Sequence, residues 1–347
     1  MNKFNIGRRT FVKGAAALTA GAAFAPALPA WAAKEIVMAT WGGDYSRLLT
    51  EIVQPLALNA DGVSVVFDTG NTSARKTKVI AQASRPTNSL DVISFGESDM
   101  HQLHEKDCLA PLTSADVPLL DSIFPQFETG YSIPHIYSGM VIVYNKDTVT
   151  APKSYKDLWN KEYEGKIGLA NILFGQAIVA SALAHGGSNE NFDPGYEPLL
   201  ELKKSGVKIL PSNEAVANAF KSGEISVSLM WRARAYQCQQ MGLPLAFSVP
   251  SEGALPVVFE AAMTKNAANP EAAKVFLNAM LDPKAQAGFA ANMGYVPTVK
   301  GAELPAELIE AISFTDAERE NFYKSNYAYV AEQGPKMLEW WNQTFKA

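Results

Sequence analysis

Two arginines stand directly behind a run of residues that favours a β-strand. Residues 225–231 are rich in β-branched and apolar side chains, and Arg232 and Arg234 follow them. A planar guanidinium group presents parallel donors that match a carboxylate or a phosphate, so an arginine pair at a strand end indicates an anion clamp. The competing interpretation is that the i,i+2 spacing points one of the two toward solvent. We expect at least one of them to bind ligand, with Arg232 favoured over Arg234.

Other residues that could contact a ligand also follow expected strands. In open α/β sheets, ligands bind outside the carboxyl ends of the strands. The residues at or just past such ends are Trp41, Asn71, Glu97, Asn171 and Trp231. Core packing is the alternative for the two tryptophans, but their places on separate strands favour a cleft. Gly42 and Gly43 let the backbone approach a ligand closely, and a helix beginning at Thr72 and Ser73 offers free amides to an anion.

The residues that could act in catalysis or bind a metal are not spaced as catalytic or metal-binding motifs require. Cys108 and Cys238 lie far apart in the chain, and two separate buried thiols are favoured over a disulfide. His101 and His104 share one helix face, but no third donor is spaced to join them. The sequence has no cysteine cluster, haem-attachment pair, nucleotide-binding glycine pattern or nucleophile elbow. We therefore expect no metal, no cofactor and no catalytic residue, and an enzyme is the less favoured class.

The elements that must position these residues alternate between β-rich runs and amphipathic helical stretches. This alternation is typical of a layered α/β architecture with mostly parallel strands. The expected strands cover residues 35–41, 63–69, 91–95, 140–144, 167–170, 225–231, 246–249 and 257–263. Helix ends are expected at the capping boxes of residues 154–157 and 315–318, at Asn269 with Pro270, and at Gly223 and Gly294.

Two segments are interpreted as crossings between lobes. Residues 140–144 lead into a polar turn and then into a loop that contains Pro152, and residues 257–263 lead back into a helix near Asn269. We therefore expect a discontinuous first lobe (residues 33–143 with 262–347) and a continuous second lobe (residues 144–261). Hinge closure around a ligand is the natural motion of this arrangement.

The first 32 residues are interpreted as an export signal. Arg8 and Arg9 precede a short Gly/Ala-rich run, and residues 30–32 (AWA) supply a signal-peptidase site, which indicates a twin-arginine signal peptide and a periplasmic location. The run is short and weakly apolar for a membrane anchor. Cleavage after Ala32 removes four basic residues and no acidic one, so the formal net charge moves from −5 to −9. Such an acidic chain disfavours nucleic acid and anionic membranes as partners.

Several short motifs follow one another along the rest of the chain. They are TWGGDY at 40–45, TGNTS at 69–73, DVI at 91–93 leading to Ser98, IP at 133–134, SG at 138–139, YNKD at 144–147 and NMGYVP at 292–297. In this order they resemble the spermidine/putrescine-type branch of the bacterial extracellular solute-binding proteins. The resemblance implies a type II periplasmic-binding-protein fold, with two α/β lobes joined by two crossover strands. It also implies a ligand in the interlobe cleft, and a monomer whose partners are an ABC permease and its ATPase, although a chemosensory role would use the same fold.

The expected cleft departs from what this resemblance implies for a polyamine. Polyamine-binding members set carboxylates against the ammonium groups of the ligand. Residues 171–174, where the resemblance implies acids, contain none. The family's Trp-x-Asp aligns with residues 257–259, which also lack an acid, so that Glu260 is the only carboxylate next to this segment. The two arginines would repel a dication. Because Glu260, Glu97 and Asp44 could receive a cationic end, we expect a zwitterionic ω-amino acid, then a simple organic anion, then a polyamine. The candidate ligand-binding residues are Trp41, Gly43, Asp44, Thr72, Ser73, Glu97, Ser98, Tyr137, Asn171, Trp231, Arg232, Arg234 and Glu260.

Overall fold

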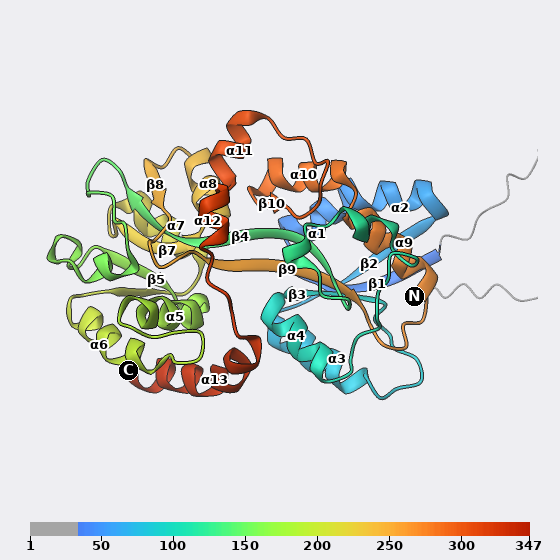
Figure 1. The fold of residues 1–347 in the computed structure, drawn as a ribbon, viewed down its shortest axis with the longest axis horizontal. Coiled ribbons are helices and arrows are strands. Elements are labelled where there is room, and N and C mark those ends of the chain that lie inside the picture. Colours follow the sequence, from blue (N-terminus) through green and yellow to red (C-terminus); the bar gives the residue numbers. More distant parts are fainter. Residues whose placement is uncertain (1–33) are drawn as a thin grey trace, which may run out of the picture. The chain divides into compact units, whose positions relative to one another are not determined.

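The structure, a computed structural model, describes residues 34–347 (Figure 1). The expected signal peptide and its cleavage site lie outside the described residues. In the described part, ten strands form one sheet, in which β8 and β10 pair with β4 and the others follow the order β2-β1-β3-β9-β4-β7-β5-β6. The strands are β1 (Lys34–Thr40), β2 (Val63–Thr69), β3 (Val92–Gly96), β4 (Ile133–Asn145), β5 (Ile167–Ala170), β6 (Lys208–Leu210), β7 (Val227–Trp231), β8 (Leu245–Ser248), β9 (Leu255–Met263) and β10 (Val296–Pro297).

Two long antiparallel strands, β4 and β9, run side by side through the middle of the sheet (Figure 1). Within residues 133–140, β4 pairs with β9 and β10, and within residues 140–145 it pairs with β7 and β8. The sequence predicted only the second half of β4, because Pro134, His135 and Gly139 are not typical strand residues. All three are buried, and ladders on both sides hold this half extended. We refer to β4 and β9 together as the crossing strands.

The first half of the sheet carries helices on both faces. Strands β1, β2 and β3 are parallel, and their apolar side chains lie in two separate buried clusters. One cluster joins them to α1 (Asp44–Leu48), α2 (Gln54–Asp61), α9 (Pro270–Met280) and α10 (Pro283–Met293). The other joins them to α3 (Thr72–Gln82) and α4 (Glu97–Glu105). The expected α/β layering is therefore present in this half.

The second half of the sheet packs with the C-terminal part of the chain as well as with its own helices. The cluster around β5 and β7 includes α5 (Phe174–Ala184), α6 (Tyr196–Lys204), α7 (Asn213–Ser222) and α8 (Arg232–Gln240). It also contains Ile312, Phe314, Met337 and Trp341, from α11 (Ala306–Ile312), α13 (Tyr327–Trp340) and the segments beside them. The expected first lobe ran to residue 347, whereas these side chains bury their apolar surface with lobe II. The other lobe boundaries stay a prediction.

Residues 313–326, which we call the strap, carry the chain from α11 through α12 (Asp316–Glu320) to α13. Two glycines let the strap pack closely on the rest of the lobe. A Cβ atom at Gly139 of β4 would lie 2.9 Å from the ring of Phe314, and one at Gly253 would overlap the carbonyl oxygen of Asn321. Gly253 also has a φ of +93°, which L side chains rarely adopt. The close packing of the strap thus requires that these two positions carry no side chain.

Local signals at helix ends behave as the sequence predicts. Capping boxes form at residues 154–157 and 315–318. Gly223 and Gly294 end α7 and α10 in the left-handed conformation, where glycine carries no steric penalty. Among the described residues, none of the helices combines the length and the apolarity that crossing a bilayer requires.

Candidate functional site

The crossing strands contribute to two different pockets, because successive residues of a strand point to opposite faces of its sheet. Ile136 and Phe259 line one pocket, with a volume of about 490 Å³, which we call the cleft pocket. Tyr137, Val258 and Glu260 line another, of about 310 Å³, which we call the strap pocket. The full lining of the cleft pocket is Trp41, Gly42, Gly43, Asp44, Tyr45, Ile136, Ile172, Asn213, Glu214, Trp231, Arg234, Gln237, Phe259, Met293 and Tyr295.

One wall of the cleft pocket is a chain of aromatic rings packed edge to face. Trp41 contacts both Tyr45 and Phe259, with ring centroids 5.4 and 5.1 Å apart, and Phe259 contacts Tyr295 at 5.4 Å. The hydroxyl of Tyr45 pairs with Nδ1 of His135 at 2.8 Å. Burial lowers the pKa of His135 to about 3, so this imidazole is neutral at physiological pH. The wall is therefore rigid and uncharged, which suits the apolar part of a ligand.

A buried arginine lies behind this wall. The guanidinium of Arg75 stacks between Trp41 and Phe95, 4.6 and 4.5 Å from the ring centroids, and donates to the carbonyl oxygens of Gly70 and Ser94. Burial lowers its pKa to about 10, which leaves it protonated at neutral pH. No carboxylate of the described residues forms a salt bridge with it, and its Nη2 has no hydrogen-bond partner there. This side of the cleft pocket thus has an uncompensated positive charge close behind it.

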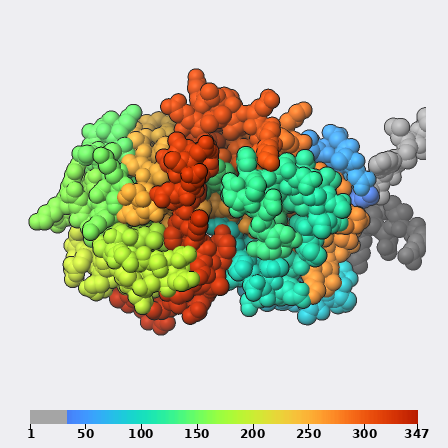
Figure 2. Space-filling view, viewed as in Figure 1, coloured from blue at the N-terminus to red at the C-terminus, as the bar shows by residue number. Residues whose placement is uncertain are grey.

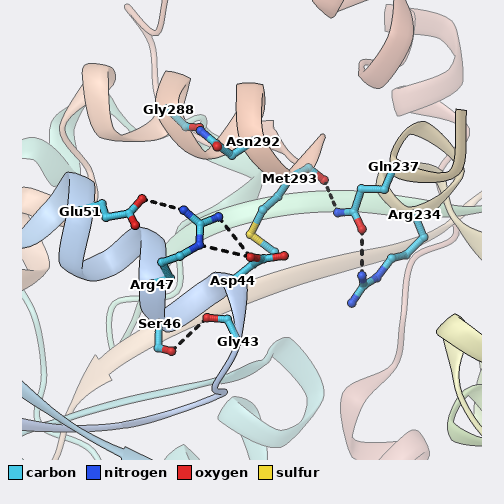
Figure 3. A network of polar contacts seen from close by, with 10 residues as sticks. All are labelled: Gly43, Asp44, Ser46, Arg47, Glu51, Arg234, Gln237, Gly288, Asn292 and Met293. Carbon is cyan, nitrogen blue, oxygen red and sulfur yellow. Dashed lines mark hydrogen bonds and ion pairs between the residues drawn. The ribbon is translucent and has the colours of Figure 1, made fainter. Parts of the chain in front are cut away.

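The opposite wall is polar and comes from α7 and α8. Arg234 donates from Nη1 to Oε1 of Gln237 at 2.8 Å and lies 3.9 Å from the carboxylate of Glu214. Gln237 in turn donates to the carbonyl oxygen of Met293 at 2.7 Å, which fixes its orientation (Figure 3). Nε of Arg234 and Oδ1 of Asn213 are buried without any hydrogen-bond partner among the described residues.

Asp44 provides a negative charge on the first wall. It accepts hydrogen bonds from Arg47, which also donates to Glu51 at 2.6 Å, and all three side chains are exposed. In Figure 3, Asp44 and Arg234 approach the same space from different helices, and both line the cleft pocket. An acid and a guanidinium at separate points of one pocket, with aromatic rings between them, match a molecule that carries both charges.

Comparison with known families decides the affiliation of the chain. The sequence profile of the bacterial extracellular solute-binding proteins matches residues 51–316. The chain belongs to this family. Bacterial extracellular solute-binding proteins are a binding family rather than an enzyme class, which agrees with the class predicted from the sequence.

Individual relatives and solved structures agree with the family. The curated spermidine/putrescine-binding periplasmic protein of Escherichia coli (strain K12) is 29% identical over 229 residues, which are 63% of this chain and 65% of that protein, so the match spans just under two thirds of the relative's length. The solved Atu4243 GABA receptor superposes with a TM-score of 0.79 at 21% identity, over 90% of this chain and 98% of that chain. The spermidine/putrescine ABC transporter substrate-binding protein PotD of Streptococcus pneumoniae superposes with a TM-score of 0.74 at 21% identity, over 90% and 100%. These likenesses confirm the predicted periplasmic-binding-protein fold.

In this solute-binding protein, five of the predicted site residues come together. Trp41, Gly43, Asp44, Trp231 and Arg234 all line the cleft pocket. Gly43 has a φ of +66° at the start of α1, so the turn that exposes Asp44 depends on this glycine. Contact of these residues with a ligand stays a prediction.

Arg232, the favoured arginine of the pair, does not line the cleft pocket. Its Nε and Nη2 donate to the carbonyl oxygens of Ala311 and Glu310 at the end of α11, at 3.3 and 2.7 Å. Its guanidinium also lies over the rings of Phe247 and Phe314. Because α8 begins at Arg232, the i,i+2 spacing turns the two arginines to different sides of the helix. Arg234 and not Arg232 therefore lines the cleft pocket, and Arg232 is buried against protein, where the alternative expected one of the pair to point to solvent. Which of the two contacts a ligand stays a prediction.

Three other predicted residues lie on the opposite face of the crossing strands. Tyr137 and Glu260 line the strap pocket, and Glu97 accepts a hydrogen bond from the Val258 amide at 2.8 Å. Neither Glu260 nor Glu97 therefore lines the cleft pocket where a ligand was expected, because strand alternation directs Phe259, and not Glu260, toward it.

The remaining predicted residues line neither pocket. Thr72 and Ser73 begin α3, whose amides at Ala74 and Arg75 are already bonded by Asn71. Ser98 lies in the first turn of α4. Asn171 accepts a hydrogen bond from Nε1 of Trp341 at 2.9 Å, and the next residue, Ile172, lines the cleft pocket in its place.

Sequence reasoning missed several residues of the cleft pocket. Tyr45 and Tyr295 belong to quoted motifs, TWGGDY and NMGYVP, but were not interpreted as site residues. Asn213 and Glu214 follow β6, a strand of three residues that was too short to predict. The serine cap at Ser212, which bonds the amide of Ala215 at 3.2 Å, was the available signal for a helix start facing the cleft.

Proposed function

We propose that this chain is the periplasmic solute-binding component of an ABC importer, exported by the twin-arginine route. The family match supports the binding class, and the names of the curated relatives support the periplasm. An ABC permease and its ATPase would then be the partners. The chain would act as a binding protein without catalysis.

We further propose that the ligand is a small amino-carboxylate of the ω-amino acid class. The observation that carries this proposal is the placement of Arg234 and Asp44 in one pocket. Arg234 would bind the carboxylate through its guanidinium group, and Asp44 on the other wall would receive the ammonium group. Trp41 and Phe259 would cover the methylene chain. The volume of about 490 Å³ lies within the range of small-molecule sites.

A polyamine is the second candidate, because curated relatives are spermidine/putrescine-binding proteins. Two features of the cleft pocket oppose it. The family resemblance puts an aspartate where this chain has Phe259. Arg234 and the buried Arg75 also place positive charge on both sides of the pocket. A small organic anion could pair with Arg234 but would offer no cationic group to Asp44.

Isothermal titration of the purified protein with a matched panel tests the ligand class. The panel holds four-carbon molecules with different ends: 4-aminobutyrate, succinate and putrescine. We expect 4-aminobutyrate to bind more tightly than either of the others. Tight binding of putrescine that Arg234→Ala leaves unchanged would overturn the anion-binding role of the cleft pocket and favour the polyamine.

Two further measurements test the transport setting. Small-angle scattering should show a smaller radius of gyration with the bound ligand, since both lobes line the cleft pocket. Arg8→Lys combined with Arg9→Lys should leave the precursor in the cytoplasm, because the twin-arginine signal is read as an address. An unchanged radius at saturation, or normal export of the double variant, would contradict the respective part of the proposal.

A further inference from the structure

The strap pocket lies on the face of the crossing strands opposite the cleft pocket, and the proposed function makes no use of it. Its walls come from three segments far apart in the sequence: the loop of residues 126–131, the crossing strands, and the strap with the first residue of α13. In Figure 2 the strap, in red, crosses this face of the molecule beside the teal loop region. A volume of about 310 Å³ is sufficient for a small molecule.

An acidic side chain without a counter-ion forms part of this pocket. Glu260 is only 4% exposed, and its Oε2 accepts a hydrogen bond from the hydroxyl of Ser132 at 2.6 Å. Within residues 34–347, no lysine or arginine nitrogen lies within 4.0 Å of its carboxylate. A buried carboxylate in this situation is costly to ionise.

A second carboxyl group, that of Glu97, interacts electrostatically with Glu260. Glu97 caps the Val258 amide, where β3 has ended and no longer provides a ladder partner. Burial raises the pKa of Glu260 to about 8, and the charge of Glu97 adds to this shift. Burial also raises the pKa of Glu97 to about 7. One positive charge in the pocket would favour the ionised form of both carboxyl groups.

The other walls are aromatic. They are formed by Phe127, Tyr131, Tyr137, Phe322, Tyr323 and Tyr327. Aromatic faces attract ammonium ions through their quadrupoles, and most strongly where water is excluded. The hydroxyl oxygen of Tyr323 is inaccessible to solvent, so this residue presents its ring to the pocket. The pocket therefore combines a buried carboxyl group with aromatic surfaces.

The two basic residues that line the pocket do not neutralise it. The guanidinium of Arg319 is bonded to the carbonyl oxygen of Phe314 and to the carboxylate of Asp316, both within the strap. Lys324 is exposed, and its Nζ forms no salt bridge with Glu260. The position next to Glu260 is thus left without a cation from the described chain.

From this arrangement we propose that the strap pocket is a second binding site, selective for a small organic ammonium ion, with Glu260 as its counter-ion. The aromatic side chains would surround the ligand. Because the walls include both the strap and the loop of residues 126–131, a bound cation would hold these segments together. This site is independent of the ligand proposed for the cleft pocket.

Isothermal titration with methylammonium, tetramethylammonium and putrescine tests the proposal on the mature protein, in an amine-free buffer above the pKa of Glu260. Sodium chloride at equal ionic strength is the reference. We expect binding of at least one ammonium probe, weakened at least about tenfold by Glu260→Gln. The matched control is Glu320→Gln, which makes the same change at an exposed residue of the strap that does not line the pocket, and should alter binding by less than about twofold.

Two more variants keep the test decisive if Glu260→Gln does not fold. Tyr323→Leu should weaken binding about two- to fivefold by removing one of the aromatic rings around the cation. Lys324→Ala should leave binding equal or tighter, because it removes a like charge. Absence of binding for every probe, or weakening by Arg234→Ala in place of Glu260→Gln, would overturn the strap-pocket site. Neither result depends on whether 4-aminobutyrate binds in the cleft.

Discussion

The cleft pocket and the strap pocket are built on the same two strands, yet their charges are opposite in character. In the cleft pocket a guanidinium has unpartnered nitrogen, while the nearby Asp44 is already paired with Arg47. In the strap pocket a buried carboxylate has no cation. The difference arises from one step along β9, since Phe259 faces one pocket and Glu260 the other. The two pockets thus differ because successive side chains of a strand point to opposite faces of the sheet, and not because the segments differ in composition.

The largest expected effect removes one wall of the strap pocket. Gly253→Ala would place a Cβ atom against the carbonyl oxygen of Asn321 at a positive φ, so the strap must shift. We expect a loss of about 3 kcal/mol or more in the free energy of unfolding, measured by urea denaturation. Gly165→Ala is the matched control, because its φ is +69° but nothing lies within 4 Å of the added atom. Similar losses in the two variants would mean that the strap contact contributes little.

The two arginines of α8 are expected to have different roles, Arg234 in ligand binding and Arg232 in stability. Arg234→Ala should raise the dissociation constant for 4-aminobutyrate at least about tenfold, since a charge-assisted hydrogen bond contributes roughly 1.5–3 kcal/mol. Arg232→Ala should lower the free energy of unfolding by about 2 kcal/mol, because it leaves the carbonyl groups of Glu310 and Ala311 without donors. Titration and urea denaturation of both variants give the comparison. Weaker binding in Arg232→Ala together with lower stability in Arg234→Ala would indicate that Arg232, and not Arg234, binds the ligand.

The dependence of stability on pH should report the strap pocket. The pKa of Glu260 is raised in the folded protein, so its contribution to stability is complete below the ordinary glutamate value and is lost as pH rises toward about 8. Glu260→Gln should reduce this loss by roughly 2 kcal/mol between about pH 5 and pH 8, measured by denaturation at each pH. The other titratable or charged groups around it are Glu97, Glu128, Tyr131, Tyr137, Arg319, Lys324 and Tyr327. Parallel pH profiles for variant and wild type would contradict the burial of an ionisable Glu260.

The smallest expected effect concerns the aromatic wall of the cleft pocket. Tyr45→Phe removes the hydrogen bond to His135 and should cost about 1 kcal/mol of unfolding free energy without changing the ring contacts. Tyr236→Phe is a suitable control, since its hydroxyl bonds no described residue. Thermal unfolding of both variants compares them, and an equal shift would show that the His135 contact adds nothing to the wall.

Much of the fold was accessible from the sequence because local signals act over few residues. Two strands, β2 and β5, begin and end where predicted, and both capping boxes formed. Strand β4 was predicted at less than half of its length, since Pro134 and Gly139 are held extended by neighbours that only the folded sheet supplies. The same limit explains the packing of the C-terminal helices with lobe II, which depends on distant apolar partners.

The candidate site was predicted only in part, for a geometric reason. Trp41 and Trp231, predicted at strand ends, both line the cleft pocket, because strand ends share one edge of a sheet. Choosing between Arg232 and Arg234 required the rotation of α8 about its axis, and choosing between Phe259 and Glu260 required the register of β9. Neither quantity can be derived from residue types alone, since each depends on contacts with α11 or with β3.

The alternation along β9 also bears on how the two pockets can change during evolution. A substitution at Phe259 alters the cleft pocket and leaves the strap pocket intact, while one at Glu260 does the opposite. Adjacent codons therefore govern separate recognition surfaces, and selection can act on one without a correlated loss in the other. An acid introduced at position 259 would change the charge of the cleft pocket without altering the side chain that lines the strap pocket.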